Sequence, residues 1–522
     1  MAKLQQETNE QEYYIYDKPF RNLYETLSNS AKRVPNKVAI FDDESEITYQ
    51  QLQHRVDQMA YFLQKQLALK EGSRIGLLFV NNIQFCIAFY ATVKIGCIAV
   101  MVNTKLQNDE ITFVLGDTKT ETLIMNASWL GKVKDNIDSL GIKNIIFDKP
   151  VSPDGITIPT YDFNHILELE SKADLEVDIC KDPWQTAAIM HTSGTTGNPK
   201  GVMIAHRNIL ETAYGYEEVL GLDESARTVL AVPIFHILGL SCVTTFFIYL
   251  GATIVLSGIY NTENVLNKIT QYKATHFHCV PTVFIKLTKA FQPIYDFSSL
   301  KVAVCGGAPI SKENADKFCE LAPNSSFRLA YGMTETAGGG VLSPEHRLPG
   351  KPTPNVAITI VDEHMLPVPT GTSGQVIFKG PNVIRNYWNG QEIENGHLAS
   401  GDIGRMDDDG FIYVVDRIKE LINRGGEKIF PSVIEKTLSN YPGISQSAVF
   451  AVSDELYGEI PAAVIVAEYG AKLSIDSIRS YLKEKIGKYE IPERIEIWDS
   501  LPTTDNGKIR KSELRKHFEN SK

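Results

Sequence analysis

The chain has 522 residues, more than a single hydrophobic core usually supports, so two or more domains are expected. Its formal charge of −11 argues against general nucleic-acid binding, which depends on Lys and Arg along a basic face. Hydrophobic residues make up 43% and charged residues 22%, a composition that excludes disordered and fibrous proteins.

The ends of the chain and its cysteines indicate where the protein works. Residues 1–12 are polar and lack the apolar stretch of a secretory signal, and residues 520–522 do not form a peroxisomal signal. The seven cysteines are scattered, with no C-x-x-C pair, as is typical of reduced thiols. A cytoplasmic location is therefore expected.

Helical and strand patterns alternate over the first four hundred residues, which indicates α/β architecture with layered, largely parallel and buried sheets. The clearest predictions are strands at 74–80, 122–125, 144–147 and 302–305 and helices at 84–95 and 311–320.

The apolar segment 236–256 is long enough to suggest a membrane span. However, Thr244 and Thr245 interrupt it, and Gly251 precedes a β-rich run at 252–256. A buried helix followed by a buried strand is therefore favoured, and no integral membrane segment is expected.

From about Gly350 the sequence changes to short β-like runs, which indicates a small β-rich subdomain. A charged segment at 416–420 follows, and then a tail of roughly one hundred residues with its own helices and strands. The predicted organisation is a large N-terminal domain at 1–415, a hinge at 416–419 and a small, mobile α+β C-terminal domain at 420–522.

The segment from His191 to Gly201, HTSGTTGNPKG, concentrates glycines, hydroxyls and a lysine. Glycines let backbone N–H groups converge on an anion, hydroxyls donate further hydrogen bonds, and the lysine supplies charge, so the loop can bind a polyphosphate. The spacing is not that of a Walker loop. A surface linker is the alternative, but the apolar runs 187–190 and 202–204 predict a hairpin anchored in the core.

Six further segments follow this loop in order: PIFH at 233–236, CGGAP at 305–309, YGMTET at 331–336, SGD at 400–402, DRIK at 416–419 and GK at 507–508. Together with the loop they resemble the adenylate-forming superfamily, which includes acyl-CoA synthetases, adenylation domains of peptide synthetases and beetle luciferases. The resemblance covers nearly the whole chain and is closest in character to bacterial acyl-CoA synthetases.

The resemblance implies a nucleotide site in which Tyr331 faces adenine, Thr334 contacts the α-phosphate and Glu335 holds Mg²⁺, an ion that prefers oxygen ligands. On its own, Glu335 could equally be an exposed charge at the start of a helix. The other residues expected to bind ATP are Thr192, Ser193, Gly194, Thr195, Thr196, Lys200, Gly307, Ala308, Pro309, Gly332 and Met333.

Further roles fall near the predicted hinge. The resemblance implies that Asp402 accepts both ribose hydroxyls, that Arg417 reaches the ribose or phosphate, and that Lys419 is the hinge position. An Asp in a Gly-rich turn is also a common turn former. Gly425 and Gly426 would line the path of the coenzyme A pantetheine chain.

The family assigns catalysis to Lys508, whose ammonium would orient the attacking carboxylate and offset negative charge. The sequence departs from the common family pattern at Thr503 and Asn506. Pro502 and Gly507-Lys508 also resemble a pattern that protein acetyltransferases recognise, so acetylation of Lys508 is a regulatory hypothesis. A homodimer is a further hypothesis, about the assembly of the protein.

The implied reaction begins with a carboxylate attacking the α-phosphorus of Mg·ATP and releasing pyrophosphate. A thiol then attacks the acyl carbon. Coenzyme A is the preferred acceptor, because Phe235-His236 lacks the carboxylate of amino-acid-activating domains and no carrier domain follows Lys508. A luciferase-type oxygenase and an acyl-AMP ligase that loads a separate carrier protein are the alternatives.

His236, also assigned to the catalytic set, lies in one of the segments that border the acyl pocket in relatives; the other residues are Phe277, Gly306, Gly332, Ala337 and Gly338. Their character suits an apolar acid, with a fatty acid favoured and an aryl or small acid as the alternative. Outside the superfamily, His276, His278 and Cys279 suggest a metal module, but strand-like alternation favours core packing.

Overall fold

The computed structural model describes residues 13–43, 45–152, 155–168, 177–192, 199–346, 349–503 and 509–520. With those gaps, the chain divides into two compact units, residues 1–358 with 378–398 (unit 1) and residues 359–377 with 399–522 (unit 2). The β-rich residues 359–377 and 399–415, predicted to belong to the N-terminal domain, group instead with the C-terminal residues. One physical reason is that the carbonyl of Val415, the last residue of this region, accepts a hydrogen bond from the Ser432 hydroxyl (2.5 Å).

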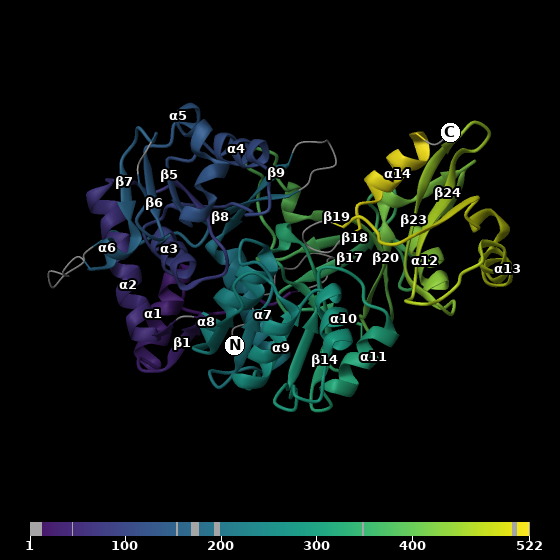
Figure 1. The fold of residues 1–522 in the computed structure, drawn as a ribbon, viewed down its shortest axis with the longest axis horizontal. Helices are drawn as coiled ribbons and strands as arrows, with labels where there is room; N and C mark the ends of the chain where they lie inside the picture. The colour runs from purple at the N-terminus through teal and green to yellow at the C-terminus, as the bar shows by residue number, and fades with distance from the viewer. Residues whose placement is uncertain are drawn as a thin grey trace. The chain divides into compact units, whose positions relative to one another are not determined.

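Unit 1 is built on two mostly parallel sheets (Figure 1). The first has the order β7 (Thr160–Asp162), β6 (Asn144–Phe147), β5 (Thr122–Met125), β3 (Arg74–Leu78), β4 (Ile98–Met101), β8 (Thr186–Thr192) and β9 (Lys200–Ala205). The second has the order β16 (Lys351–Pro352), β15 (Gly340–Leu342), β14 (Ser326–Gly332), β13 (Val302–Cys305), β12 (His276–Cys279), β10 (Arg227–Leu230), β11 (Thr253–Leu256), β1 (Val38–Phe41) and β2 (Glu46–Thr48).

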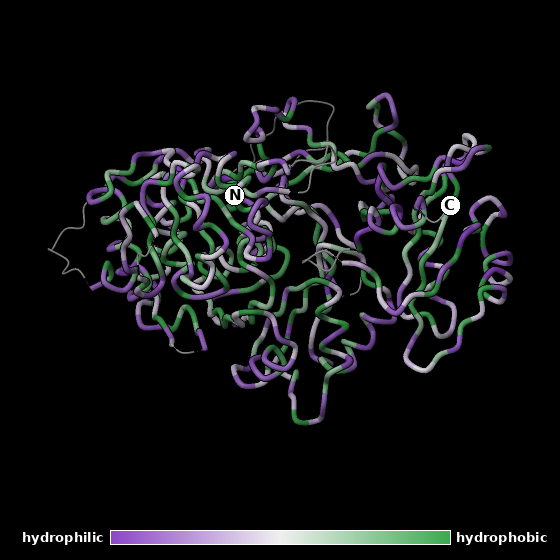
Figure 2. Tube along the Cα trace, turned by 45° about the horizontal axis from the view of Figure 1, so that its top comes forward, coloured by the Kyte–Doolittle hydropathy of each residue, from purple (hydrophilic) through white to green (hydrophobic). Residues whose placement is uncertain are grey.

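Helices cover and separate these sheets. Their bounds are α1 Leu23–Arg33, α2 Tyr49–Tyr61, α3 Ile83–Lys94, α4 Asn108–Asp117, α5 Ile137–Leu140, α6 Phe163–Glu168, α7 His206–Leu220, α8 Phe246–Leu250, α9 Thr262–Gln271, α10 Pro281–Ala290 and α11 Lys312–Leu321. One continuous core joins strands of both sheets with α1, α2, α3, α7 and α8. Figure 2 shows hydrophobic stretches running through the interior of this unit.

Helix α3 shows why the sequence folds this way. The Asn82 side chain accepts a hydrogen bond from the Phe85 N–H (2.8 Å), which caps the helix start. Nearly every residue of α3 is buried, so its apolar surface on all sides suits a position within the core. The predicted helix at 84–95 is confirmed at Ile83–Lys94.

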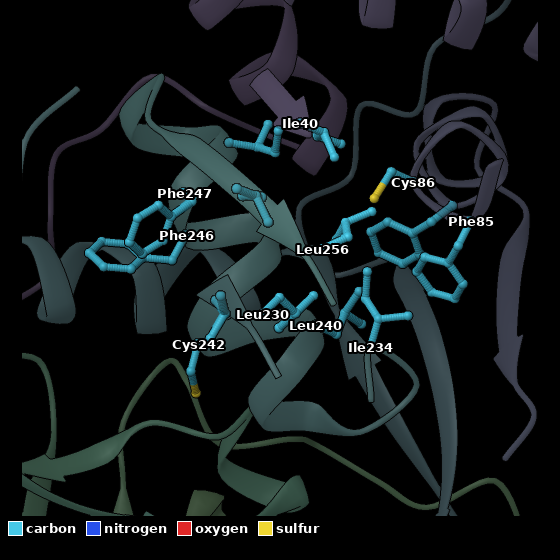
Figure 3. Close-up of a cluster of buried hydrophobic side chains, with 14 of the residues drawn as sticks. Ile40, Phe85, Cys86, Leu230, Ile234, Leu240, Cys242, Phe246, Phe247 and Leu256 are labelled. Carbon is cyan, nitrogen blue, oxygen red and sulfur yellow. The ribbon is translucent and has the colours of Figure 1, made fainter. Parts of the chain in front are cut away.

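The apolar segment 236–256 forms a π-helix, η4 (Leu238–Thr245), then α8 and strand β11, which confirms the buried helix followed by a buried strand. Figure 3 shows Phe246, Phe247 and Leu256 of this segment in one hydrophobic cluster. Of the helices that the structure describes, none combines the length and the apolar character that crossing a bilayer demands.

Unit 2 holds most of a small four-stranded sheet, together with an α+β part. The sheet has the order β17 (Ala357–Val361), β18 (Gly374–Lys379), β19 (Leu398–Met406) and β20 (Ile412–Arg417). The remaining elements are β21 (Ile422–Arg424), β22 (Glu427–Ile429), α12 (Pro431–Ser439), β23 (Ile444–Asp454), β24 (Gly458–Ala467), α13 (Ile475–Lys485), β25 (Arg494–Trp498) and α14 (Lys511–Asn520). The predicted α/β class with a small β-rich part and a small α+β part is confirmed.

Candidate active site

The glycine-rich segment begins and ends in an antiparallel hairpin. Thr192 closes β8 and pairs with Lys200, the first residue of β9, and His191 pairs with Gly201. The His191 Nε2 lies 2.9 Å from the Asp117 carboxylate, which ties the hairpin to the end of α4. The hairpin prediction is therefore confirmed, whereas Ser193, Gly194, Thr195 and Thr196 lie outside the described residues.

Four side chains meet beside this hairpin, and we call Lys200, Glu335, Tyr387 and Gln391 the nucleotide-side cluster. The Lys200 ammonium donates to the Gln391 side-chain oxygen (3.1 Å) and lies 5.6 Å from the centre of the Tyr387 ring. The Tyr387 hydroxyl donates to Glu335 Oε1 (3.3 Å). Burial, followed by the nearby Glu335 charge, raises the pKa of Tyr387, so the phenol stays protonated and able to donate.

Sequence reasoning predicted Lys200 and Glu335 but missed Tyr387 and Gln391. The latter two lie on a loop held against the hairpin, where the Trp388 N–H donates to the Gly201 carbonyl (2.8 Å). The Trp388 indole N–H donates to the Asp117 carbonyl (2.9 Å). A packed loop of this kind has no sequence period, so only the fold shows which side chains reach Lys200.

The segment YGMTET ends β14 and turns sharply. Thr336 is buried; its hydroxyl accepts from the Met333 N–H (3.0 Å) and donates to the Gly339 carbonyl (2.5 Å). Ala337 has a left-handed φ of 51°, which non-glycine residues seldom adopt. This turn leaves Tyr331, Thr334 and Glu335 half-buried, within reach of a ligand.

The Tyr331 ring lies beside a second aromatic ring, that of Phe378, with 5.3 Å between centroids. The segment CGGAP starts at Cys305, the last residue of β13, and its Gly307, Ala308 and Pro309 are exposed. Gly307 has a φ of 80°, which suits glycine. In parallel sheets, ligands bind beyond the carboxyl ends of strands, and both of these segments begin there.

Two of the residues predicted to border an acyl pocket, Gly306 and Gly338, lie beside three buried side chains. We call Tyr216, Cys242 and His278, with Gly306 and Gly338, the acid-side cluster. The Tyr216 and His278 rings stack at 6.0 Å, and the Tyr216 hydroxyl donates to the Gly338 carbonyl (3.5 Å). A Cβ at Gly338 would lie 2.6 Å from the Cys242 sulfur, so that position requires glycine.

The acid-side cluster combines residues from α7, η4 and β12 with two glycine turns. Figure 3 shows Cys242 at the edge of the hydrophobic cluster, with its sulfur pointing away from Leu230 and Leu240. Tyr216, Cys242 and His278 are each only 1% exposed. The cluster is therefore shielded from bulk solvent and carries no formal charge, in contrast to the nucleotide-side cluster.

His278 is the polar member of the acid-side cluster. Its Nε2 lies 3.4 Å from where a Cβ of Gly306 would be. Neither of its ring nitrogens has a hydrogen-bond partner among the described residues. Burial lowers the pKa of His278 to about 3, so the imidazole is neutral at physiological pH.

Phe277, which the sequence placed near an acyl pocket, points to the other side of the sheet. Its ring packs against Phe284 of α10 at 5.4 Å. Successive residues of a strand face opposite ways, so His278 is the member of this segment that faces Gly306. The strand-like alternation of this segment is visible in the sequence, where it predicts core packing but not which residue faces Gly306.

Within the described ranges, no three His, Cys, Asp or Glu side chains are grouped as a metal site requires.

His236 precedes η4 and is half-buried, with its ring 4.7 Å from that of Phe235. Its carbonyl accepts a hydrogen bond from the Leu240 N–H (2.9 Å), so the residue sits at the start of the helical segment that supplies Cys242. The structure therefore places His236 next to an element of the acid-side cluster.

In unit 2, Asp402 and Arg417 face each other across β19 and β20. The Arg417 Nε lies 2.9 Å from Asp402 Oδ1, and the Asp402 side chain is 5% exposed whereas that of Arg417 is 41% exposed. A buried carboxylate needs a partner of this kind. The two residues predicted to bind the ribose are therefore neighbours, which the sequence motifs did not reveal.

Lys419 is exposed in a short 3₁₀ turn at Ile418–Glu420. The next residue, Glu420, is anchored: the Lys511 ammonium lies 2.9 Å from Glu420 and 2.9 Å from Glu435. The nearby carboxylates outweigh burial and raise the pKa of Lys511, so it stays charged. The predicted hinge position is therefore next to a network of ion pairs within unit 2.

Gly425 and Gly426 form the tight turn between β21 and β22, with φ of 58° and 99°. A two-residue hairpin of this type needs positive φ at both positions, so the glycines have a structural reason independent of any ligand. The loop with Lys508 lies outside the described residues. Its flanks are joined by a bridge between Thr503 and Ile509.

Comparison with known proteins adds evidence of another kind. The model of the AMP-binding enzyme family matches residues 27–388, and that of the AMP-binding enzyme C-terminal domain matches residues 433–508. The crystal structure of the anthranilate CoA ligase AuaEII in complex with anthranoyl-AMP has a TM-score of 0.86 with this chain at 26% sequence identity, covering 98% of each.

Three relatives illustrate the range of proteins that this chain is similar to. A feruloyl-CoA synthase of an Amycolatopsis species is 30% identical, covering 94% of this chain and 97% of its own length. A 2-succinylbenzoate–CoA ligase of Bacillus velezensis is 31% identical, with 94% and 98% covered. The long-chain-fatty-acid–CoA ligase FadD13 of Mycobacterium tuberculosis is 29% identical, with 90% and 93% covered.

Proposed function

Because the chain belongs to the AMP-binding enzyme family, we propose that it joins a compact carboxylic acid to coenzyme A in two steps, by way of an acyl-adenylate. The expectation of an AMP-forming acid–thiol ligase is confirmed at the level of the family. The identity of the acid, the roles of individual residues and the use of Mg²⁺ are the content of the proposal.

In the first step, the hairpin and its neighbours would bind the triphosphate of ATP. Lys200 supplies positive charge at the base of the glycine-rich loop, and Thr334 supplies a hydroxyl for the α-phosphate. Glu335 fits a magnesium ligand, because its carboxylate is half-buried and is oriented by the Tyr387 hydroxyl. When bound, Mg²⁺ would neutralise charge on the phosphates.

Unit 2 would contribute the ribose and transfer residues. Asp402 is a buried acceptor for the ribose hydroxyls, and its partner Arg417 is exposed enough to reach a phosphate. Lys508 would bring its ammonium to the carboxylate and the adenylate oxygens in the first step. For the second step, the exposed turn at Lys419 is the proposed hinge, and the Gly425-Gly426 turn is the proposed border of the pantetheine path.

The acid-side cluster carries the choice of acid. Tyr216, Cys242 and His278 lie beside Gly306 and Gly338 and are buried, and two of these side chains are planar rings. A ring-sized acid fits such surroundings better than a long alkyl chain, so we place an aryl or small acid before the fatty acid that the sequence favoured. A long-chain acid stays the second candidate, on the strength of the similarity to FadD13.

The proposal is tested by incubating the full chain with Mg²⁺, ATP and one acid at a time, and measuring pyrophosphate release. Benzoate, 3-phenylpropenoate, hexanoate and palmitate form a suitable panel. We expect the two ring acids to give the highest kcat/KM and to form a thioester when coenzyme A is added. Highest activity with palmitate would establish the second candidate instead, and no pyrophosphate with any acid would refute the proposal.

Two alternatives concern the partner in the second step and its control. A pyrophosphate signal without any coenzyme A thioester would favour an enzyme that loads a separate carrier protein.

The regulatory hypothesis is that a protein acetyltransferase modifies Lys508 and stops adenylation. Mapping acetylated lysines by mass spectrometry tests it, and the hypothesis fails if exposed lysines react while Lys508 does not. Sedimentation of the pure protein would test the homodimer considered above.

A further inference from the structure

His278 has an environment that the proposed reaction does not explain. It lies at the end of β12, fully enclosed, with both ring nitrogens lacking a hydrogen-bond partner among the described residues. Buried polar atoms are nearly always hydrogen-bonded, because losing water without a replacement costs free energy. His276, two residues earlier on the same face, follows this rule in part, since its Nδ1 lies 3.0 Å from the Thr228 hydroxyl.

The orientation of His278 is as informative as its missing partners. One nitrogen, Nε2, faces Gly306, where the absence of a side chain leaves the ring edge uncovered by that residue. The Tyr216 ring lies beside the imidazole, with 6.0 Å between ring centroids and 26° between the ring planes. The polar edge is therefore directed toward the glycine turn that we assign to the acid.

We infer that His278 selects an acid that carries one uncharged hydrogen-bonding group, such as a hydroxyl or amino group, at the end remote from its carboxylate. The inference rests on the proposed function, and it names the substrate class of the same site. A neutral imidazole offers one donor and one acceptor, and a hydroxyl can match either.

The surroundings argue against other classes of acid. A second carboxylate would be buried without a countercharge, because Tyr216, Cys242 and His276 beside His278 are uncharged: burial lowers the pKa of His276 well below its usual value and raises the pKa values of Tyr216 and Cys242. A plain alkyl or phenyl group would leave the histidine unsatisfied. Acids with one neutral polar substituent avoid both costs.

The test compares matched acids, each with and without one hydroxyl: benzoate against 4-hydroxybenzoate, and 3-phenylpropenoate against its 4-hydroxy form. For wild type, we expect kcat/KM to favour the hydroxylated member of at least one pair by about ten- to a hundred-fold, as a buried hydrogen bond that would otherwise be lost implies. In His278→Leu the preference should fall to within about three-fold, and His278→Gln should restore part of it. His276→Leu, a matched histidine on the same strand and face, should keep the wild-type ratio.

Calorimetric binding of the same acids to wild type gives a readout that needs neither turnover nor a variant. Tighter binding of a hydroxylated acid supports the inference. Equal binding and equal kcat/KM within both pairs, or a preference that survives in His278→Leu, would overturn it. Absence of pyrophosphate release with every acid would refute the proposed function alone, because the calorimetric comparison would still decide the role of His278.

Discussion

The nucleotide-side cluster and the acid-side cluster lie in the same unit but follow opposite physical rules. In the first, Lys200, Glu335, Tyr387 and Gln391 are charged or polar, contact one another and are half-buried or exposed. In the second, Tyr216, Cys242 and His278 are buried and uncharged, and the histidine nitrogens find no partner in the described chain. If the proposed function holds, phosphate recognition would rely on charge that water can still screen, whereas acid recognition would rely on shape and a single polar contact.

The largest effect is expected for Lys508, the residue that we assign to the first step. Lys508→Ala should lower acid-dependent pyrophosphate release by about 10³-fold, because it removes the ammonium that we propose aligns the carboxylate and stabilises developing charge. Thioester formation from a supplied acyl-adenylate should be largely retained. Stopped-flow assays of the two half-reactions measure this, and equal losses in both would contradict a role confined to the first step.

Glu335→Gln should lower turnover by about 100-fold and raise the Mg²⁺ concentration required, since one ligand charge is lost without creating a cavity. Rates measured across a magnesium titration give both values. Glu363→Gln, at a side chain that is 76% exposed, is the matched control and should behave like wild type. An unchanged magnesium requirement in Glu335→Gln would remove the residue from the metal site.

The burial of His278 in the acid-side cluster should make the free energy of unfolding depend on pH. The folded-state pKa of His278 is lowered to about 3, below its usual value of 6.5, so the folded state binds fewer protons than the unfolded state between these values. Its contribution to stability is therefore lost as the pH falls below 6.5. Between pH 6.5 and 5, wild type should lose about 2 kcal/mol more than His278→Leu. Urea unfolding at both pH values measures the difference, and parallel losses would argue that His278 is hydrated.

The smallest effect is expected from removing the Thr228 hydroxyl, and it distinguishes the role of His276 from that of His278. Thr228→Val removes the hydroxyl 3.0 Å from His276 Nδ1 and should lower the free energy of unfolding by about 1 kcal/mol. The preference between hydroxylated and unsubstituted acids should not change, because Thr228 pairs with His276, two residues before His278 on the strand. A change in that preference would mean that the two histidines act together.

Much of the local structure could be predicted from the sequence. The strands at 122–125, 144–147 and 302–305 have the predicted bounds, and the glycine-rich segment lies between two paired strands as expected. Continuous apolar runs between turn residues are short-range signals, and they persist in the fold because both faces of these strands are buried. Lys200 and Glu335 of the nucleotide-side cluster were also singled out from the sequence, because they belong to contiguous motifs.

The acid-side cluster could not be found in that way. Tyr216, Cys242 and His278 come from three elements far apart in the chain, and none of them belongs to a motif. Period-two alternation predicts that His276 and His278 share a face, but not that one is paired with Thr228 while the other faces Gly306. Likewise, the contact of Tyr387 with Glu335 depends on how a loop packs on the β8–β9 hairpin. The sequence by itself determined the elements and the phosphate motifs, through local periodicity and turn chemistry. Only the tertiary structure decided which side chains face one another, because packing joins residues that no local pattern relates.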